Sequence, residues 1–165
     1  SGEDLRAIRR GGNFQSHIAK YLNSKVPLTF IVVTSYDTAD QDDTLINEFL
    51  DELERKEKNL RPINIILVIS KWDLSGRMDV DSPEELDNFI ENNLRRTSQR
   101  FDANELSKTF YTIGNVESRD GKQKITLLNL DTAAVLSNWL YESITGYPLD
   151  YEGTFWERIK FSFTN

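Results

Sequence analysis

The alternation of short apolar runs with amphipathic segments constrains the fold of this chain most strongly. Residues 27–35 (PLTFIVVTS) and 63–70 (INIILVIS) carry no charge and are rich in β-branched side chains. Runs of this kind are typical of strands that are covered on both faces of a sheet. Between them, residues 42–59 have helical periodicity, with an apolar stripe made of Leu45, Phe49, Leu50 and Leu53. A strand, a helix and a second strand in this order predict a right-handed βαβ unit and a parallel sheet.

The same alternation continues through the second half of the chain. Residues 82–96 (SPEELDNFIENNLRR) predict a helix with Ser82 as N-cap, Pro83 in the first turn and Glu85 completing a capping box. Residues 108–114 (KTFYTIG) predict a third strand. The following segment, 115–124 (NVESRDGKQK), is polar, and we expect it to form a loop.

Both ends of the chain are predicted to be helical or to pack on the domain. Residues 4–22 predict two helical pieces separated by Gly11-Gly12. A helix over 131–144 is expected to bury Val135, Leu136, Trp139 and Leu140. We therefore expect one α/β domain over residues 1–146, an open and mainly parallel sheet with helices on both faces. The aromatic tail, 147–165, should pack on this domain or on a partner.

Composition excludes several classes of function. The net charge of −7 disfavours a general nucleic-acid or anionic-membrane surface, because phosphates would be repelled. No cysteine is present, which excludes disulfides, thiol catalysis and zinc–thiolate sites. No run is long enough to span a bilayer, and no signal-peptide apolar region begins the chain. A cytoplasmic protein is the expectation.

Polar residues that follow buried strands are the candidates for a binding site. In open α/β sheets, ligands bind at the carboxyl ends of the strands, where the connecting loops gather. The positions that matter should therefore lie just after Ser35, Ser70 and Ile113. The tetrapeptide Ser70, Lys71, Trp72 and Asp73 occupies one of them.

This tetrapeptide resembles the [N/T/S]-K-x-D motif with which small GTPase-type domains of the translation-factor-related class select guanine. In the sequence SKWDL, the resemblance implies that Asp73 accepts the N1–H and the exocyclic amine of guanine, and that the stem of Lys71 lies along the base. The order of the surrounding segments is most similar to the bacterial double-GTPase branch of that class. The resemblance implies a P-loop NTPase-like fold and GTP or GDP as the ligand.

Two further segments are similar to motifs of the same family. The strand that ends at FYTIG should carry a short [S/T]-A-type motif, and Thr112, Ile113 and Gly114 occupy its positions. A backbone amide there would contact the guanine carbonyl. At the start of the chain, SGEDLR is similar to the end of a D-x-x-G switch motif, which makes Gly2 and Glu3 switch-like residues. An alternative is that Ser1-Gly2 remains from a cleaved tag and that this match is accidental.

The departure from the family is the phosphate loop. No G-x-x-x-x-G-K-[ST] sequence occurs in the chain, and Gln123 follows Gly121-Lys122 where a magnesium-binding hydroxyl should stand. We therefore expect the C-terminal portion of a GTPase domain, or a degenerate one. Mg²⁺ would be required only if an upstream phosphate loop exists, and this chain alone should not hydrolyse GTP. A protein partner or a second half of the GTPase domain is expected.

Other interpretations of these residues remain open. The chain could instead be a pseudo-GTPase that acts as a protein-interaction module without nucleotide, or an unrelated α/β domain. Trp72 is expected to pack beside the base site and not to stack on the base. The acidic group Asp37, Asp40, Asp42 and Asp43 could suggest a cation site, but such groups usually favour a helix start. His17 is interpreted as a helix residue without a catalytic role.

Overall fold

Three parallel strands form the central sheet of the protein. The computed structural model describes residues 27–57, 63–76 and 83–149. Within them, strands β1 (Thr29–Ser35), β2 (Asn64–Ser70) and β3 (Ser107–Phe110) lie side by side in that order. Their pairing is parallel throughout, with Val32 opposite Leu67 and Val68 opposite Thr109. The predicted α/β class with a parallel sheet is confirmed.

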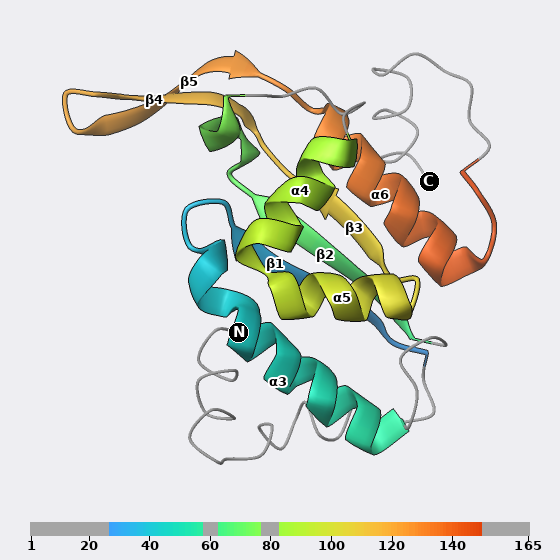
Figure 1. The fold of residues 1–165 in the computed structure, drawn as a ribbon. Coiled ribbons are helices and arrows are strands. Elements are labelled where there is room, and N and C mark those ends of the chain that lie inside the picture. The colour runs from blue at the N-terminus through green and yellow to red at the C-terminus, as the bar shows by residue number, and fades with distance from the viewer. Residues whose placement is uncertain (1–26, 58–62, 77–82, 150–165) are drawn as a thin grey trace.

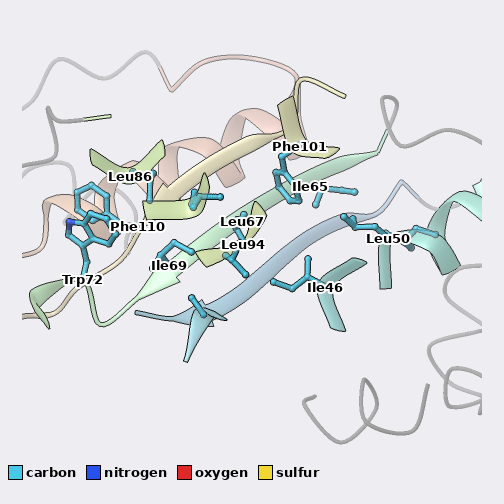
Figure 2. Close-up of a cluster of buried hydrophobic side chains, with 13 residues drawn as sticks. Ile46, Leu50, Ile65, Leu67, Ile69, Trp72, Leu86, Leu94, Phe101 and Phe110 are labelled. Atoms are coloured by element: carbon cyan, nitrogen blue, oxygen red, sulfur yellow. The ribbon is translucent and has the colours of Figure 1, made fainter. Parts of the chain in front are cut away.

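Three helices cover one face of this sheet. They are α3 (Ala39–Glu57), α4 (Pro83–Asn93) and α5 (Arg95–Ala103). Because the connections from β1 to β2 and from β2 to β3 advance in the same direction, right-handed crossovers place these helices on one side. Figure 2 shows the resulting core, in which β2 side chains meet the helices. Its buried members include Ile46, Leu50, Leu53, Ile65, Leu67, Ile69, Leu86, Ile90, Leu94 and Phe101.

Helix α6 (Asp131–Thr145) covers the opposite face. Trp139 donates from Nε1 to the Ser107 hydroxyl of β3 at 2.8 Å, and Asn64 of β2 donates to the Ser143 carbonyl of α6 at 2.7 Å. On the same face, Ile66 and Val68 of β2 are buried. Helices on both faces of the sheet were predicted, and α6 confirms this. No helix in the described segments is long and apolar enough to cross a membrane.

Two expectations about burial are wrong. Strand β1 is not covered on both faces, because Ile31 and Val33 are 42% and 59% exposed. The reason is that β1 is the outermost strand of the described sheet. Val135 of α6 is also exposed, whereas Leu136, Trp139 and Leu140 are half-buried.

The single helix predicted over 82–96 is two helices. The backbone leaves the helical conformation at Leu94 (φ −129°), and α5 begins at the next residue. Leu94 provides no side-chain cap. Instead Asp43 of α3 accepts hydrogen bonds from the backbone amides of Arg96 and Thr97, at 3.3 and 2.9 Å. A cap supplied by another helix cannot be recognised from local periodicity. Ser82, the predicted N-cap of α4, lies outside the described residues, as do residues 4–22 and the tail beyond Leu149.

The segment expected to be a loop forms a β-hairpin. Strands β4 (Gly114–Arg119) and β5 (Lys122–Leu128) pair antiparallel around Asp120 and Gly121, whose φ angles are 53° and 71°. Two consecutive positive φ values are typical of a type I′ turn, for which Asp-Gly is a favoured pair. The hairpin extends away from the sheet and the helices (Figure 1). The predicted third strand is accordingly shorter, ending at Phe110.

Candidate functional site

Ser70 ends β2 and ties it to β1. Its hydroxyl donates to the Thr34 carbonyl at 2.9 Å, and its own carbonyl accepts from the Tyr36 amide at 2.9 Å. Both bonds join the carboxyl ends of neighbouring strands. Ser70 therefore fixes the edge of the sheet from which the next residues leave.

Lys71 turns the chain out of the sheet. Its backbone is left-handed (φ 56°, ψ 38°), a conformation that costs a non-glycine residue about 1 kcal/mol or more. Its ammonium lies 2.9 and 3.1 Å from the two carboxylate oxygens of Asp37, which follows β1. The hydrogen bond from Lys71, and secondly one from Ser35, hold the pKa of Asp37 below its usual range. Both Lys71 and Asp37 are about half exposed, so the ammonium is accessible at the sheet edge.

Trp72 points away from the site and into the core. It begins the short 3₁₀ helix η1 (Trp72–Ser75) and is only 3% exposed. Its ring stacks on Phe110 at a centroid distance of 4.9 Å and meets Tyr36 and Phe89 edge-on. Figure 2 shows Trp72 and Phe110 together at one end of the core. The packing role expected of Trp72 is confirmed, and its buried indole ring is not available to a ligand.

Asp73 and Thr112 come from different predicted motifs and meet in the structure. The Thr112 hydroxyl lies 3.2 Å from Asp73 Oδ1 across a sequence separation of 39 residues. The contact follows from the sheet order, because β2 and β3 are neighbours and both residues follow the ends of those strands. Asp73 is half-buried. Among the described side chains, Thr112 is the one that reaches this carboxylate.

Thr112 is held in place by α6. Its amide donates to the Thr132 hydroxyl at 3.2 Å, and that hydroxyl donates to the Thr112 carbonyl at 2.9 Å. Both threonines are buried. The Thr112 hydroxyl accepts from the Gly114 amide at 3.0 Å, and the Gly114 carbonyl, also at 3.0 Å, competes with Asp73 for its single proton. The orientation of Thr112 therefore depends on three elements: η1, α6 and the start of β4.

Ile113 is exposed at the edge of the site, and Gly114 beside it is buried. Ile113 is 41% exposed, and within the described segments its backbone N–H has no acceptor. Gly114 has φ +129°, and a Cβ there would lie 1.8 Å from the Leu127 carbonyl oxygen. Only glycine allows β5 to approach this closely.

Two residues of the site were not predicted from the sequence. Asp37 follows β1 as Asp73 follows β2, so the rule about the carboxyl ends of strands could have identified it. Thr132 gave no signal, because a threonine in the first turn of a helix is common. Gly2, Glu3 and His17 lie outside the described residues.

The acidic residues around the start of α3 are dispersed among separate partners. Asp37 pairs with Lys71, and Asp42 accepts from the Thr34 hydroxyl at 2.6 Å. Asp43 caps α5, and Asp40 lies in the exposed first turn of α3. In the described segments, no three potential ligands gather to hold a metal ion.

At this carboxyl edge of the parallel sheet, the described residues present the ion pair of Lys71 with Asp37, the carboxylate of Asp73 and the backbone N–H of Ile113. Such a set can bind a planar group with two adjacent N–H donors and a carbonyl. Among the described residues at this edge, the one ammonium, that of Lys71, is paired with Asp37. Comparisons with protein-family models, with curated proteins and with solved structures find no match for this chain.

Proposed function

We propose that this chain is the guanine-recognising part of a GTPase-like nucleotide-binding protein. The observation that carries the proposal is the contact between Asp73 and Thr112. The two residues were selected separately, by resemblance to two motifs of one family, and they are neighbours at one edge of the sheet.

The chemistry of the base explains which groups are needed. Guanine presents N1–H and an exocyclic amine side by side, and a carboxylate can accept both because it has about four acceptor positions. One position on Asp73 Oδ1 is used by Thr112, which leaves the others for the base. The free N–H of Ile113 would donate to the guanine carbonyl, and the stem of Lys71 would cover the base face. Adenine offers an acceptor where the carboxylate needs a donor, so it should be rejected.

The missing phosphate loop limits what the chain does alone. With no G-x-x-x-x-G-K-[ST] sequence, the phosphates would remain in solvent, and a second half of the GTPase domain would have to bind them together with Mg²⁺. The isolated chain should therefore bind the nucleoside part of GTP or GDP weakly and should not hydrolyse GTP.

Calorimetric titration of the full chain with GMP, GDP, GTP and ADP tests the proposal. We expect the three guanine nucleotides to bind within about threefold of one another, since no phosphate contact distinguishes them. ADP should give no heat of binding. Asp73→Asn should weaken GDP binding at least about tenfold and favour xanthosine diphosphate, whose N1–H and 2-carbonyl match an amide. Asp40→Asn, on the exposed first turn of α3, is the matched control. Absence of guanine-selective binding would reject the proposal.

A second candidate function is favoured by the hairpin. Strand β5 is exposed along its whole length and carries Ile125, Leu127 and Leu128 at 43%, 53% and 57% exposure. An isolated two-stranded hairpin is marginally stable, and exposed apolar groups of this kind mark interaction surfaces. A pseudo-GTPase that binds a protein through this hairpin is the alternative if no nucleotide binds.

A further inference from the structure

In the part of the chain that the structure describes, strand β1 has an unpaired edge, and its own sequence lacks the features that normally prevent edge pairing. Natural proteins protect edge strands with lysine, proline, bulges or very short strands. The sequence of β1, TFIVVTS, is seven residues long, has no charge, proline or glycine, and pairs without a bulge to β2. In the described sheet, no strand pairs with its other edge.

The uncovered face of this strand is apolar. Ile31 and Val33 lie on the face of the sheet on which α6 packs, and although α6 contacts β1, these two side chains remain 42% and 59% exposed. On the other face, Phe30 and Val32 pack against the core. An open backbone edge and an open apolar face therefore coincide at the same residues.

The sequence of β1 is nearly symmetric about its middle residue. An antiparallel pairing centred on Val32 places Thr29 opposite Ser35, Phe30 opposite Thr34, and Ile31 opposite Val33. Hydroxyl residues then meet at the ends, and β-branched apolar residues meet in the middle. This register uses all seven residues and opposes no like charges, because the strand has none. A two-fold symmetric interface requires self-complementarity of this kind.

We propose that two copies of this chain associate through antiparallel pairing of their β1 edges. The two three-stranded sheets then become one six-stranded sheet, and Ile31 and Val33 of each copy cover those of the other. The two candidate nucleotide sites lie at opposite ends of this sheet, because the strands run in opposite directions across the axis. The association does not depend on nucleotide binding.

Cysteine crosslinking tests the register directly, because the chain has no cysteine of its own. Val32→Cys places two thiols opposite each other on the two-fold axis, within the range that a disulfide bridges. We expect most of this variant to form a covalent dimer under mild oxidation. Thr29→Cys is the matched control, since its two copies would lie roughly 20 Å apart along the strands. A Val32→Cys chain that stays monomeric, or a Thr29→Cys chain that crosslinks as well, would overturn the proposal.

Sedimentation equilibrium of the unmodified chain measures the association itself. We expect a monomer–dimer equilibrium, and we expect Val33→Lys to raise its dissociation constant by about tenfold or more, since each dimer loses two apolar pairs. Because Val33 is largely exposed, circular dichroism should remain unchanged. Leu127→Lys, which replaces an equally exposed residue on the hairpin, should leave the equilibrium unaltered. A chain that is monomeric throughout, or an association sensitive to Leu127→Lys instead, would exclude pairing through β1.

Discussion

Asp43 and Asp73 are two aspartates that each lie beside a threonine hydroxyl contributed by a distant part of the chain. Asp43 Oδ1 accepts from the amide and the hydroxyl of Thr97 and from the Asn47 side chain, and its Oδ2 accepts from the Arg96 amide. Asp73 accepts, among the described residues, only from Thr112. The resemblance of SKWDL to a guanine-selecting motif singles out Asp73, but the sequence does not show how many donors each carboxylate accepts from.

The difference lies in how far each carboxylate is saturated. A carboxylate with four internal donors has no capacity left for a ligand, and its role is to hold α3 and α5 together. A half-buried carboxylate with one donor keeps most of its acceptor positions open. The number of internal donors to the carboxylate therefore separates a structural aspartate from a candidate binding residue.

The largest effect is expected from Asp43→Ala. The substitution leaves the amide and the hydroxyl of buried Thr97 without their acceptor and removes the cap of α5, so the free energy of unfolding should fall by about 3 kcal/mol. Urea denaturation measures this loss in the free energy of unfolding. Asp40→Ala, in the same helical turn but exposed, should cost less than about 0.5 kcal/mol. Equal effects of the two substitutions would mean that the cap contributes nothing.

Gly114→Ala should have the next largest effect. The Cβ of the alanine would collide with the Leu127 carbonyl oxygen. The alanine would also have to adopt a backbone conformation that glycine adopts readily and other residues do not, at a cost of about 2 kcal/mol. The strain lies next to Thr112, so GDP binding should weaken as well. Gly121→Ala, at the hairpin turn with nothing near its Cβ, should cost about 1 kcal/mol and leave binding intact. If GDP binding is unaltered in Gly114→Ala, the start of the hairpin does not contribute to the binding site.

Asp73→Ala should change stability less than Asp43→Ala or Gly114→Ala. Only the Thr112 hydroxyl loses a partner, and the Gly114 carbonyl is available to it as an alternative acceptor. We expect a loss of under about 1 kcal/mol by urea denaturation, together with loss of GDP binding. A stability loss as large as that of Asp43→Ala would make Asp73 a structural residue.

The sequence could predict the elements that local patterns determine, and it could not predict those that depend on contacts between distant residues. Strands β1 and β2 and helices α3 and α6 follow from their own apolar patterns, and parallel pairing follows from the alternation of strands and helices, but the sheet order was not predicted. Helix α5 was missed because its sequence, RRTSQRFDA, is polar, and its start is capped by Asp43 from another helix. The β4–β5 hairpin was missed although Asp120-Gly121 is a recognised turn signal, because the flanking residues are mostly polar.

For the candidate site, the ends of the predicted strands indicated which positions carry the site residues but not which residues they contact. Ser70 ends β2, Lys71 and Asp73 follow it, and Thr112 follows β3, as expected. That Asp37 pairs with Lys71, and that Thr132 positions Thr112, depends on contacts across the sheet edge. No pattern along the chain carries that information.

The smallest expected effect is a change in the pKa of Asp37, which reports whether Lys71 is hydrogen-bonded to this carboxyl. The pKa of this exposed carboxyl is lowered by its hydrogen bond with Lys71 and secondly by Ser35. A lowered folded-state pKa means that the pair adds stability above the unfolded-state value, about 3.9, and loses it as the pH falls through the folded value. Lys71→Gln should return the pKa of Asp37 towards its usual range, measured by NMR titration of the side-chain carboxyl.

Nucleotide binding should move the same pKa. If the stem of Lys71 lies along the guanine face, its ammonium leaves Asp37, and the pKa of Asp37 rises when GDP saturates the site. GDP should produce no such rise in Asp73→Asn, which retains the Lys71–Asp37 pair but lacks the base acceptor. A pKa of Asp37 that stays low in the GDP complex would mean that Lys71 remains bound to Asp37. Base recognition would then rest on Asp73 and the Ile113 amide alone.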